Sequence, residues 1–396
     1  MAKETLVDIM DMILKRVGIG DYVRFNFYSL SEGRFYSFKL PTHILNKYPK
    51  VSHGVTFCCA TSNGWLVLVA GPDHNPDMFL FDPISEIDVR LPPLTTIPFS
   101  STYIEEHCRI ACMIYTVYVF SISDDPTRNL ITVTVFGDVL NDEELLAFCN
   151  CDIGVKEEER SWKIFDADGA ISGYNTESML FHDGVLYILI SNKNYDFNNF
   201  KSSQDDKRIG DEINHVIILK TDCCEVKMKI IDIVKHNTAP HIRPCDNKLR
   251  FIAYSGLRYV YLAKSITGEL LIIWNKTDPL SEHEDDYELH IYHISKLTIE
   301  RYQGISKTSK DFESITSLDD QALFVSPNSN SFSIPARSDR NGCQANCIYF
   351  TMDGIDALYK KSLTLYRQSG IYLMQEERIK RPFPNPPLWF QPQLRN

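Results

Sequence analysis

The stretch SNGWLVLVAGPDHNPDMFLFDPIS (62–85) contains a complete predicted β-hairpin together with its turns. Asn63-Gly64 favours the positive φ angles of a tight turn, and the aromatic and β-branched run 65–70 predicts a buried strand. After a polar loop, residues 78–81 predict a second strand, which ends where Asp82-Pro83 removes a backbone donor. The stretch is therefore predicted to be scaffold rather than an active site.

The composition is that of a folded protein with no general affinity for polyanions. The 396 residues are 44% hydrophobic, and 41 basic against 52 acidic side chains give a formal charge of −11. This balance argues against binding to nucleic acid or to an anionic membrane through the whole surface. No run approaches 18 apolar residues, and Asp8 and Asp11 lie inside the apolar pattern of the N-terminus, so neither a transmembrane helix nor a secretory signal peptide is predicted.

The eleven cysteines occur mostly as close pairs, such as Cys149/Cys151 and Cys343/Cys347. This pattern favours reduced, buried thiols, and it predicts a protein of the nucleus or cytoplasm. No C-x₂-C pair is present, and His290 and His293 would point to opposite faces of a strand. We therefore expect no metal site and no cofactor.

The N-terminal residues have the apolar period of a helix. Leu6, Ile9, Met10, Ile13, Leu14 and Val17 form one stripe, and a short cluster of Tyr22, Val23 and Phe25 follows. The spacing predicts a short amphipathic helix that Gly18 can end.

This segment carries a first resemblance. ETLVDIMDMILKRVGIGDYVRF (4–25) resembles the front half of a plant F-box, the motif that docks on the Skp adaptor of a cullin ubiquitin ligase through apolar helix faces. The usual opening Leu-Pro and the later Val-Cys-x-x-Trp segment are absent, so the motif is truncated. The alternative is an amphipathic helix that packs on its own domain. The resemblance implies that the docking residues are Ile9, Ile13, Leu14, Val17, Tyr22, Val23 and Phe25.

A second resemblance covers most of the remaining chain. The stretches that carry it are FYSLSEGRFYSFKLP (27–41), SNGWLVLV with LFDPIS (62–85), LPPL (91–94), GLRYVYLAKSITGELLII (256–273), LDDQALFVSPNSNSFSIPA (318–336), NCIYFTMDG (346–354) and PFPNPPLWF (382–390). They are similar to the KIB-type β-propeller family of plant F-box proteins, which are kelch-like in architecture. The resemblance implies a partial F-box-like helical segment at 1–26 and a β-propeller at 27–396. It also implies a substrate receptor of a Skp-cullin-F-box ligase.

The strand pattern independently predicts a mainly β, repetitive fold. Turn dipeptides precede three like strands, WLVLV, VLYILI and ELLIIW, and the glycines of these turns are 120 and 84 residues apart. Blades of about 40–60 residues would place two blades between successive copies and give about six blades in the ring. Ring closure predicts that 347–350 lies in a closing or near-closing blade, and that Trp389 and Phe390 cover a sheet edge.

Function is predicted to be binding rather than catalysis. No phosphate loop, zinc-protease motif or nucleophile elbow is present. The polar insertion 192–214 interleaves Tyr195, Phe197 and Phe200, and it is interpreted either as a candidate substrate-recognition loop or as a mobile insertion. The alternatives are a propeller adaptor that does not dock on the ligase, or an enzyme with a site in the central channel. The identity of the protein substrate does not follow from the sequence.

Overall fold

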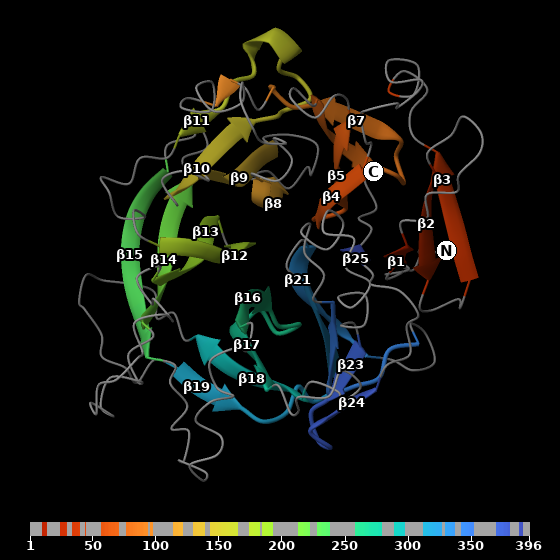
Figure 1. Ribbon diagram of the computed structural model, residues 1–396, viewed down its shortest axis with the longest axis vertical. Helices are drawn as coiled ribbons and strands as arrows, with labels where there is room; N and C mark the ends of the chain where they lie inside the picture. Colours follow the sequence, from red (N-terminus) through yellow and green to blue (C-terminus); the bar gives the residue numbers. More distant parts are fainter. Residues whose placement is uncertain are drawn as a thin grey trace.

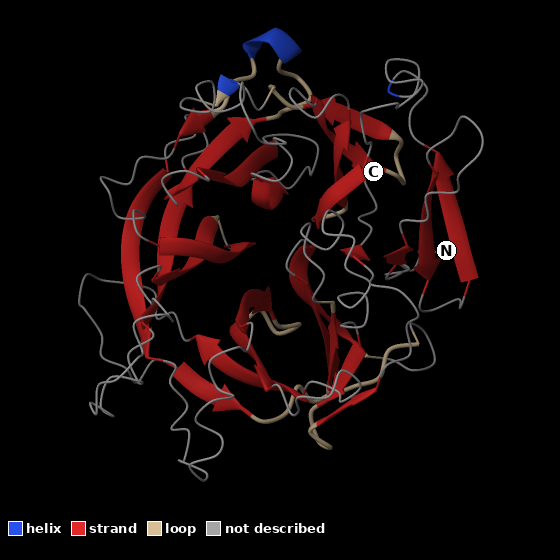
Figure 2. Ribbon diagram, in the orientation of Figure 1, coloured by secondary structure: helices blue, strands red, loops and turns tan. Residues whose placement is uncertain are grey.

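The described part of the chain is mainly β and forms a ring of sheets (Figure 2). The computed structural model describes residues 10–13, 24–29, 34–39, 44, 57–70, 77–93, 96–97, 114–121, 130–138, 143–164, 174–182, 184–192, 213–221, 228–237, 258–278, 289–297, 312–326, 329–336, 342–351, 370–380 and 388–390. Helical structure there is confined to short pieces such as the 3₁₀ helix η3 (Glu157–Glu159). None of the described helical pieces has the length and apolar character needed to cross a membrane.

Five sheets surround a common axis, as expected for a β-propeller (Figure 1). Three sheets are four-stranded meanders of consecutive strands. The first contains β8 (Ile114–Ser121), β9 (Leu130–Asp138), β10 (Glu143–Asn150) and β11 (Lys163–Ile164). The second contains β12 (Tyr174–His182), β13 (Val185–Asn192), β14 (Ile213–Thr221) and β15 (Met228–Asn237). The third contains β16 (Arg258–Lys264), β17 (Leu270–Asp278), β18 (Leu289–Leu297) and β19 (Phe312–Ile315).

The other two sheets combine strands from distant parts of the chain. One has the order β25-β1-β2-β3, built from β25 (Leu388–Phe390), β1 (Met10–Ile13), β2 (Arg24–Ser29) and β3 (Arg34–Lys39). The nine-stranded sheet contains β4 (Phe57–Ser62), β5 (Trp65–Ala70), β6 (Asp77–Asp82), β7 (Ile87–Arg90), β20 (Gln321–Ser326), β21 (Ser329–Pro335), β22 (Cys347–Phe350), β23 (Gly370–Leu373) and β24 (Arg378–Lys380). Because β21 joins two four-stranded groups into this one sheet, the blade number of about six stays a prediction.

The hairpin predicted at 62–85 is confirmed. Strand β5 is buried along its whole length, and Asn63 and Gly64 have φ angles of 47° and 78°, as a tight hairpin turn requires. After β6, the Asp82 carboxylate accepts hydrogen bonds from the Ile84 N–H (3.0 Å) and the Ser85 hydroxyl (2.5 Å). The carboxylate thereby holds the turn that Pro83 begins.

The three like strands occupy equivalent places in the fold. β5, β13 and β17 each form the second strand of an antiparallel meander, and Gly184 and Gly268 have positive φ angles in the preceding turns. Between the turns before β5 and β13, which are 120 residues apart, the chain changes sheet twice, as predicted. Between the turns before β13 and β17, which are 84 residues apart, it changes sheet only once. The prediction of two blades for the second interval is wrong, because the length of the loops varies between sheets.

Apolar side chains fill the spaces between successive sheets. Val67 of β5 packs in one cluster with Val119 of β8, while the ring of Phe120 stacks on that of Phe181 with centroids 4.3 Å apart. Leu189 of β13 shares another cluster with Leu262 of β16. Each of these sheets is therefore buried on the faces that meet its neighbours, which is the packing of a propeller.

The structure describes four of the eleven cysteines as buried thiols. Cys149, Cys151 and Cys347 are buried and form no disulfide. Burial raises the pKa of Cys347 to about 11, so this thiol stays protonated at neutral pH.

The predicted N-terminal helix is wrong where the structure describes it. Residues Met10–Ile13 form strand β1, which pairs with β2 on one side and with β25 on the other. Pairing supplies backbone partners on both sides, and this outweighs the helical period of the side chains. Residues 143–148 likewise lie in a strand, β10, which pairs with β9.

This sheet pairs strands that are far apart in the sequence, β1 and β25. Met10 pairs with Phe390 and Met12 pairs with Leu388, so residues 388–390, which follow Pro386-Pro387, form a strand instead of merely covering an edge. Strand β25 also contacts β4, β20 and β21, which places the junction beside the sheet that contains Cys347–Phe350. The prediction that 347–350 lies in a near-closing position is confirmed.

Candidate functional site

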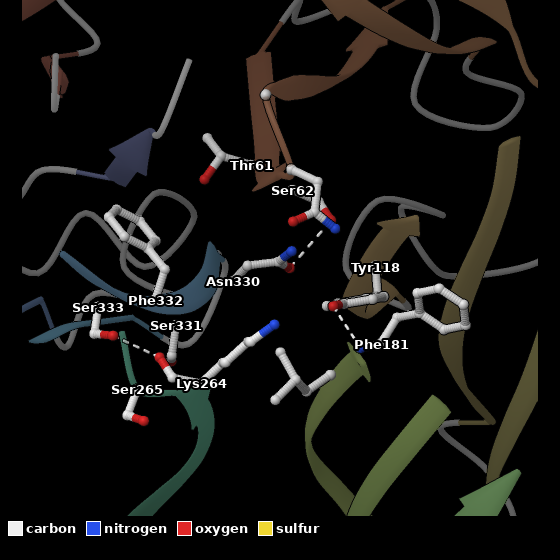
Figure 3. A pocket seen from close by; sticks show the side chains of 13 residues that line it. Thr61, Ser62, Tyr118, Phe181, Lys264, Ser265, Asn330, Ser331, Phe332 and Ser333 are labelled. Atoms are coloured by element: carbon white, nitrogen blue, oxygen red, sulfur yellow. Dashed lines mark hydrogen bonds between the residues drawn. The ribbon is translucent and has the colours of Figure 1, made fainter. Parts of the chain in front are cut away.

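A cavity of about 300 Å³ lies where the innermost strands of the ring approach one another (Figure 3). Strands β4, β8, β12, β16 and β21 supply its walls, and they lie closest to the centre in Figure 1. The lining residues are Thr61, Ser62, Asn63, Gly64, Tyr118, Leu180, Phe181, Lys264, Ser265, Asn330, Ser331, Phe332 and Ser333. We call this cavity the channel pocket.

The Ser62 hydroxyl connects three walls of the channel pocket. It accepts a hydrogen bond from the Val119 N–H at 2.6 Å. Its single proton points toward two acceptors, the Val119 carbonyl at 3.0 Å and Asn330 Oδ1 at 3.1 Å. The side chain of Asn63 donates a further bond of 2.7 Å to the same carbonyl. The turn after β4 is therefore fastened to β8 and β21 by side chains.

The phenol of Tyr118 links β8 to β12. Its oxygen accepts a 2.7 Å hydrogen bond from the Phe181 N–H. Burial raises the pKa of Tyr118 to about 12, although hydrogen bonds from Phe181 and from the Asn63 side chain oppose the increase. The phenol is neutral at physiological pH and retains its proton for donation.

Lys264 is the charged side chain among the described residues of the lining. It is the last residue of β16, where the Ser333 hydroxyl donates a 2.6 Å bond to its backbone carbonyl. Its side chain is exposed and extends into the pocket in Figure 3. Within the part of the chain that the structure describes, its ammonium has no carboxylate partner. The pocket is therefore locally positive although the protein is acidic.

Strand β21 contributes two polar groups that make no hydrogen bond to described protein atoms. They are the amide nitrogen of Asn330 and the hydroxyl of Ser331, and both atoms are buried. Ser331 as a residue is only 5% exposed. Buried donors without an acceptor are unfavourable and are uncommon in native proteins. These two groups therefore mark the wall where a bound acceptor would be favourable.

The described lining of the pocket combines hydrogen-bonding groups, one cation and apolar side chains. Hydroxyl, amide and ammonium groups line the pocket together with Leu180, Phe181 and Phe332, and none of the described lining residues is Asp, Glu, His or Cys. Across the described ranges, no group of three or more such residues could hold a metal ion. The pocket can donate hydrogen bonds and one positive charge, and it offers apolar contacts beside them.

The predicted adaptor-binding residues are only partly within the described chain. Ile13 lies in β1 and Phe25 lies in β2, opposite Phe38 of β3. The other five, Ile9, Leu14, Val17, Tyr22 and Val23, are outside the described residues. The structure therefore does not test these seven residues as a docking surface, but it places two of them in a sheet rather than on a helix.

The predicted recognition loop begins away from the channel pocket. Tyr195, Phe197 and Phe200 are themselves outside the described residues. Asn192, the last residue of β13, pairs with Tyr174, at the end of β12 opposite to the turn beside Phe181. The loop and the pocket therefore start from opposite ends of the same sheet.

Sequence reasoning missed every residue of the channel pocket as a functional residue. Lys264 stands three residues before the turn dipeptide Thr267-Gly268, and 329–333 reads SNSFS, a mostly polar run within a predicted scaffold. A basic residue at the end of an apolar strand was the available signal. It was weak because it gives no indication that five strands converge at one place.

Replacing Ser62 with alanine should lower the free energy of unfolding by about 1–3 kcal/mol, because the buried Val119 N–H loses its acceptor. Ser331→Ala is the matched control, since its buried hydroxyl has no described protein partner. We expect this control to stay within about 0.5 kcal/mol of the wild type. Urea unfolding followed by tryptophan fluorescence measures both. Equal losses for the two variants would contradict the hydrogen-bond network described for Ser62.

Several solved structures show weak similarity to this chain. One is the NanB sialidase from Streptococcus pneumoniae, at 10% identity over 66% of this chain and 33% of the sialidase, with a TM-score of 0.34. A GH93 α-L-arabinofuranosidase of Fusarium graminearum has 9% identity, coverage of 72% and 73%, and a TM-score of 0.32. An endo-arabinase from Bacteroides thetaiotaomicron has 12% identity, coverage of 76% and 96%, and a TM-score of 0.32. The chain spans about a third of the length of the sialidase, and scores this low support no functional conclusion.

The family of this chain follows from a sequence profile and not from the solved structures. A search of curated proteins finds no match to this sequence. The sequence profile of the KIB1-4 β-propeller family matches residues 27–372, which is most of the chain and agrees with the ring of sheets. This protein therefore belongs to the KIB1-4 β-propeller family.

Proposed function

We propose that this chain is the substrate-recognition subunit of a Skp-cullin-F-box ubiquitin ligase, and that it binds a protein substrate through its propeller. The observation that carries the binding role is the channel pocket, where five strands bring together buried donors and one ammonium that has no carboxylate partner among the described residues. Membership of the propeller family supports the receptor role. The F-box-like stretch 4–25 supports the connection to the ligase.

The side chains of the pocket favour binding over the hydrolytic chemistry that some propellers perform. Glycoside hydrolysis uses two carboxyl groups about 5–9.5 Å apart. A serine nucleophile needs an adjacent base, whereas the Ser62 hydroxyl is bonded to the Val119 backbone and lies beside the Asn330 amide. The described lining offers neither arrangement. This chemistry supports a non-catalytic subunit.

A second candidate function is a propeller that holds its substrate without docking on the ligase. Strand β1 favours it, because Met10–Ile13 pairs on both sides and is not part of a free helix. A backbone committed to two neighbouring strands cannot simultaneously present Ile13 on the helix face that the F-box resemblance implies.

Direct binding to a purified Skp adaptor separates the two candidates. If the ligase proposal holds, the full-length chain should bind the adaptor, and Leu14→Asp should weaken binding by about tenfold or more, since an apolar anchor becomes charged. Calorimetry and pull-down measure the affinity. Ile84→Asp is a matched control, because Ile84 is an exposed apolar residue (39%) on the propeller and should not matter.

The result assigns one of the two functions. Failure of the wild-type chain to bind the adaptor would overturn the ligase proposal and leave the adaptor-free propeller. Equal weakening by Ile84→Asp would show that capture is nonspecific apolar adhesion.

A further inference from the structure

We propose that the channel pocket binds a carboxylate of the protein partner, with the Lys264 ammonium as its counter-ion and the donors of β21 as its hydrogen-bonding wall. The proposal rests on the proposed function in one respect, since it takes the ligand to be part of a protein. It adds the chemical group that the propeller recognises and the residues that recognise it.

The first step of the argument is charge. The Lys264 side chain reaches into a pocket whose other described lining residues are uncharged, and no described carboxylate neutralises it. Within a partly enclosed site an ion pair is stronger than in open water, because solvent screening is reduced. A single anionic group from outside the chain is therefore the complementary ligand.

The second step is hydrogen bonding. The Asn330 amide nitrogen and the Ser331 hydroxyl are buried and have no acceptor among the described protein atoms. Asn330 Oδ1 accepts a 3.1 Å hydrogen bond from Ser62, so the amide oxygen has a partner and the amide nitrogen is the group that still lacks an acceptor. A carboxylate has two acceptor oxygens and no donor, which matches an ammonium beside neutral donors.

The third step excludes a phosphate as the preferred anion. Phosphate sites in proteins usually combine several cationic side chains or a row of backbone N–H groups, because the group carries close to two negative charges. The described lining has one cation, and the whole protein has a formal charge of −11. One positive charge in an acidic protein suits a monoanion better than a dianion.

The fourth step is size and the apolar part of the wall. A volume of about 300 Å³ is at the lower end of ligand pockets, so it accommodates one or two residues of a partner rather than a folded element. Leu180, Phe181 and Phe332 border the polar groups. They provide contacts for the methylene groups of the side chain that carries the carboxylate, or for its neighbour in the partner.

The test uses short capped peptides and the full-length protein. Acetyl-Gly-Glu-Gly-amide presents a side-chain carboxylate, acetyl-Gly-Gly-Gly with a free C-terminus presents a terminal one, and acetyl-Gly-Gln-Gly-amide is the uncharged match. Acetylation of lysines by an activated ester, read by mass spectrometry, reports protection at Lys264. We expect saturable protection by one or both carboxylate peptides and none by the glutamine peptide. The exposed Lys163 of β11 should react equally in all cases.

Variants provide the second readout, with peptide affinity measured by ligand-observed NMR. Lys264→Met should weaken binding of the protecting peptide by about tenfold or more, and Ser331→Ala should weaken it by several-fold without destabilising the fold. Lys163→Met, a matched loss of one charge outside the pocket, should bind like the wild type.

Three outcomes would overturn the proposal. They are binding of the glutamine peptide as tightly as the tighter-binding carboxylate peptide, tighter binding of inorganic phosphate than of either carboxylate peptide, and an unchanged affinity in Lys264→Met. None of these results depends on the Skp adaptor. Failure of the peptide experiment would therefore refute the carboxylate site only, and adaptor binding would still decide the ligase proposal.

Discussion

Replacing Phe350 with alanine should lower the free energy of unfolding by about 3–5 kcal/mol, the range for truncation of a fully buried aromatic side chain. Phe350 of β22 has no exposed surface, and its ring lies 5.2 Å from that of Tyr292 on β18. A Cβ added at Gly370 would come within 3.1 Å of the Phe350 ring, so the ring is closely packed on the β23 backbone. The alanine variant would leave a cavity between two sheets that these neighbours cannot fill.

Urea unfolding measures this loss of stability, and two further variants serve as comparisons. Phe350→Leu preserves most of the apolar volume and should cost less than the alanine variant. Ile84→Ala removes methyl groups from a residue that is 39% exposed and should change stability by no more than about 0.5 kcal/mol. A loss below about 1 kcal/mol for Phe350→Ala would contradict tight packing between the β16–β19 sheet and the β20–β24 strands.

The parts of the fold that were predictable from the sequence are those in which local signals agree. The strand β5 combines an unbroken apolar run with a turn dipeptide, and both features require the same hairpin. The strands β13 and β17 likewise combine an apolar run with a preceding turn dipeptide. The ordered stretches of family resemblance then gave the propeller, and the profile match over 27–372 confirms it.

The N-terminus shows where local signals fail. The stripe that includes Met10 and Ile13 has helical spacing, but these residues pair with Phe390 and Asn26. Contacts across nearly the whole chain are absent from any short window of sequence. When a segment can satisfy its backbone on both sides, tertiary pairing overrides a weak intrinsic preference.

The channel pocket was unpredictable for a related reason. Its polar residues come from five strands, and each is ordinary in its own segment: Ser62 ends a strand, Lys264 precedes a turn, and Asn330 belongs to a polar run. Only the ring geometry brings them together. The sequence predicted the aromatic loop at 192–214 instead, because loop length and composition are properties of a single segment.

Replacing Asp11 with proline should lower the free energy of unfolding by about 2–4 kcal/mol, because Asp11 lies between Tyr28 of β2 and Trp389 of β25. Proline has no N–H for the ladder and restricts φ to a value that suits a central strand poorly. Removing residues 388–396 should have an effect at least as large, since β25 also contacts β4, β20 and β21. That truncation would also expose the edge of β1, so the truncated protein should self-associate more readily.

Urea unfolding and light scattering measure these effects, and Asp11→Thr is the matched control, because threonine retains the N–H and favours strands. The experiment also distinguishes the two roles of the N-terminus. If residues 10–13 act only as a docking helix, Asp11→Pro should abolish binding to the Skp adaptor and leave the stability of the propeller unchanged. If they close the ring, as the pairing of β1 with β25 indicates, stability should fall whether or not the adaptor binds.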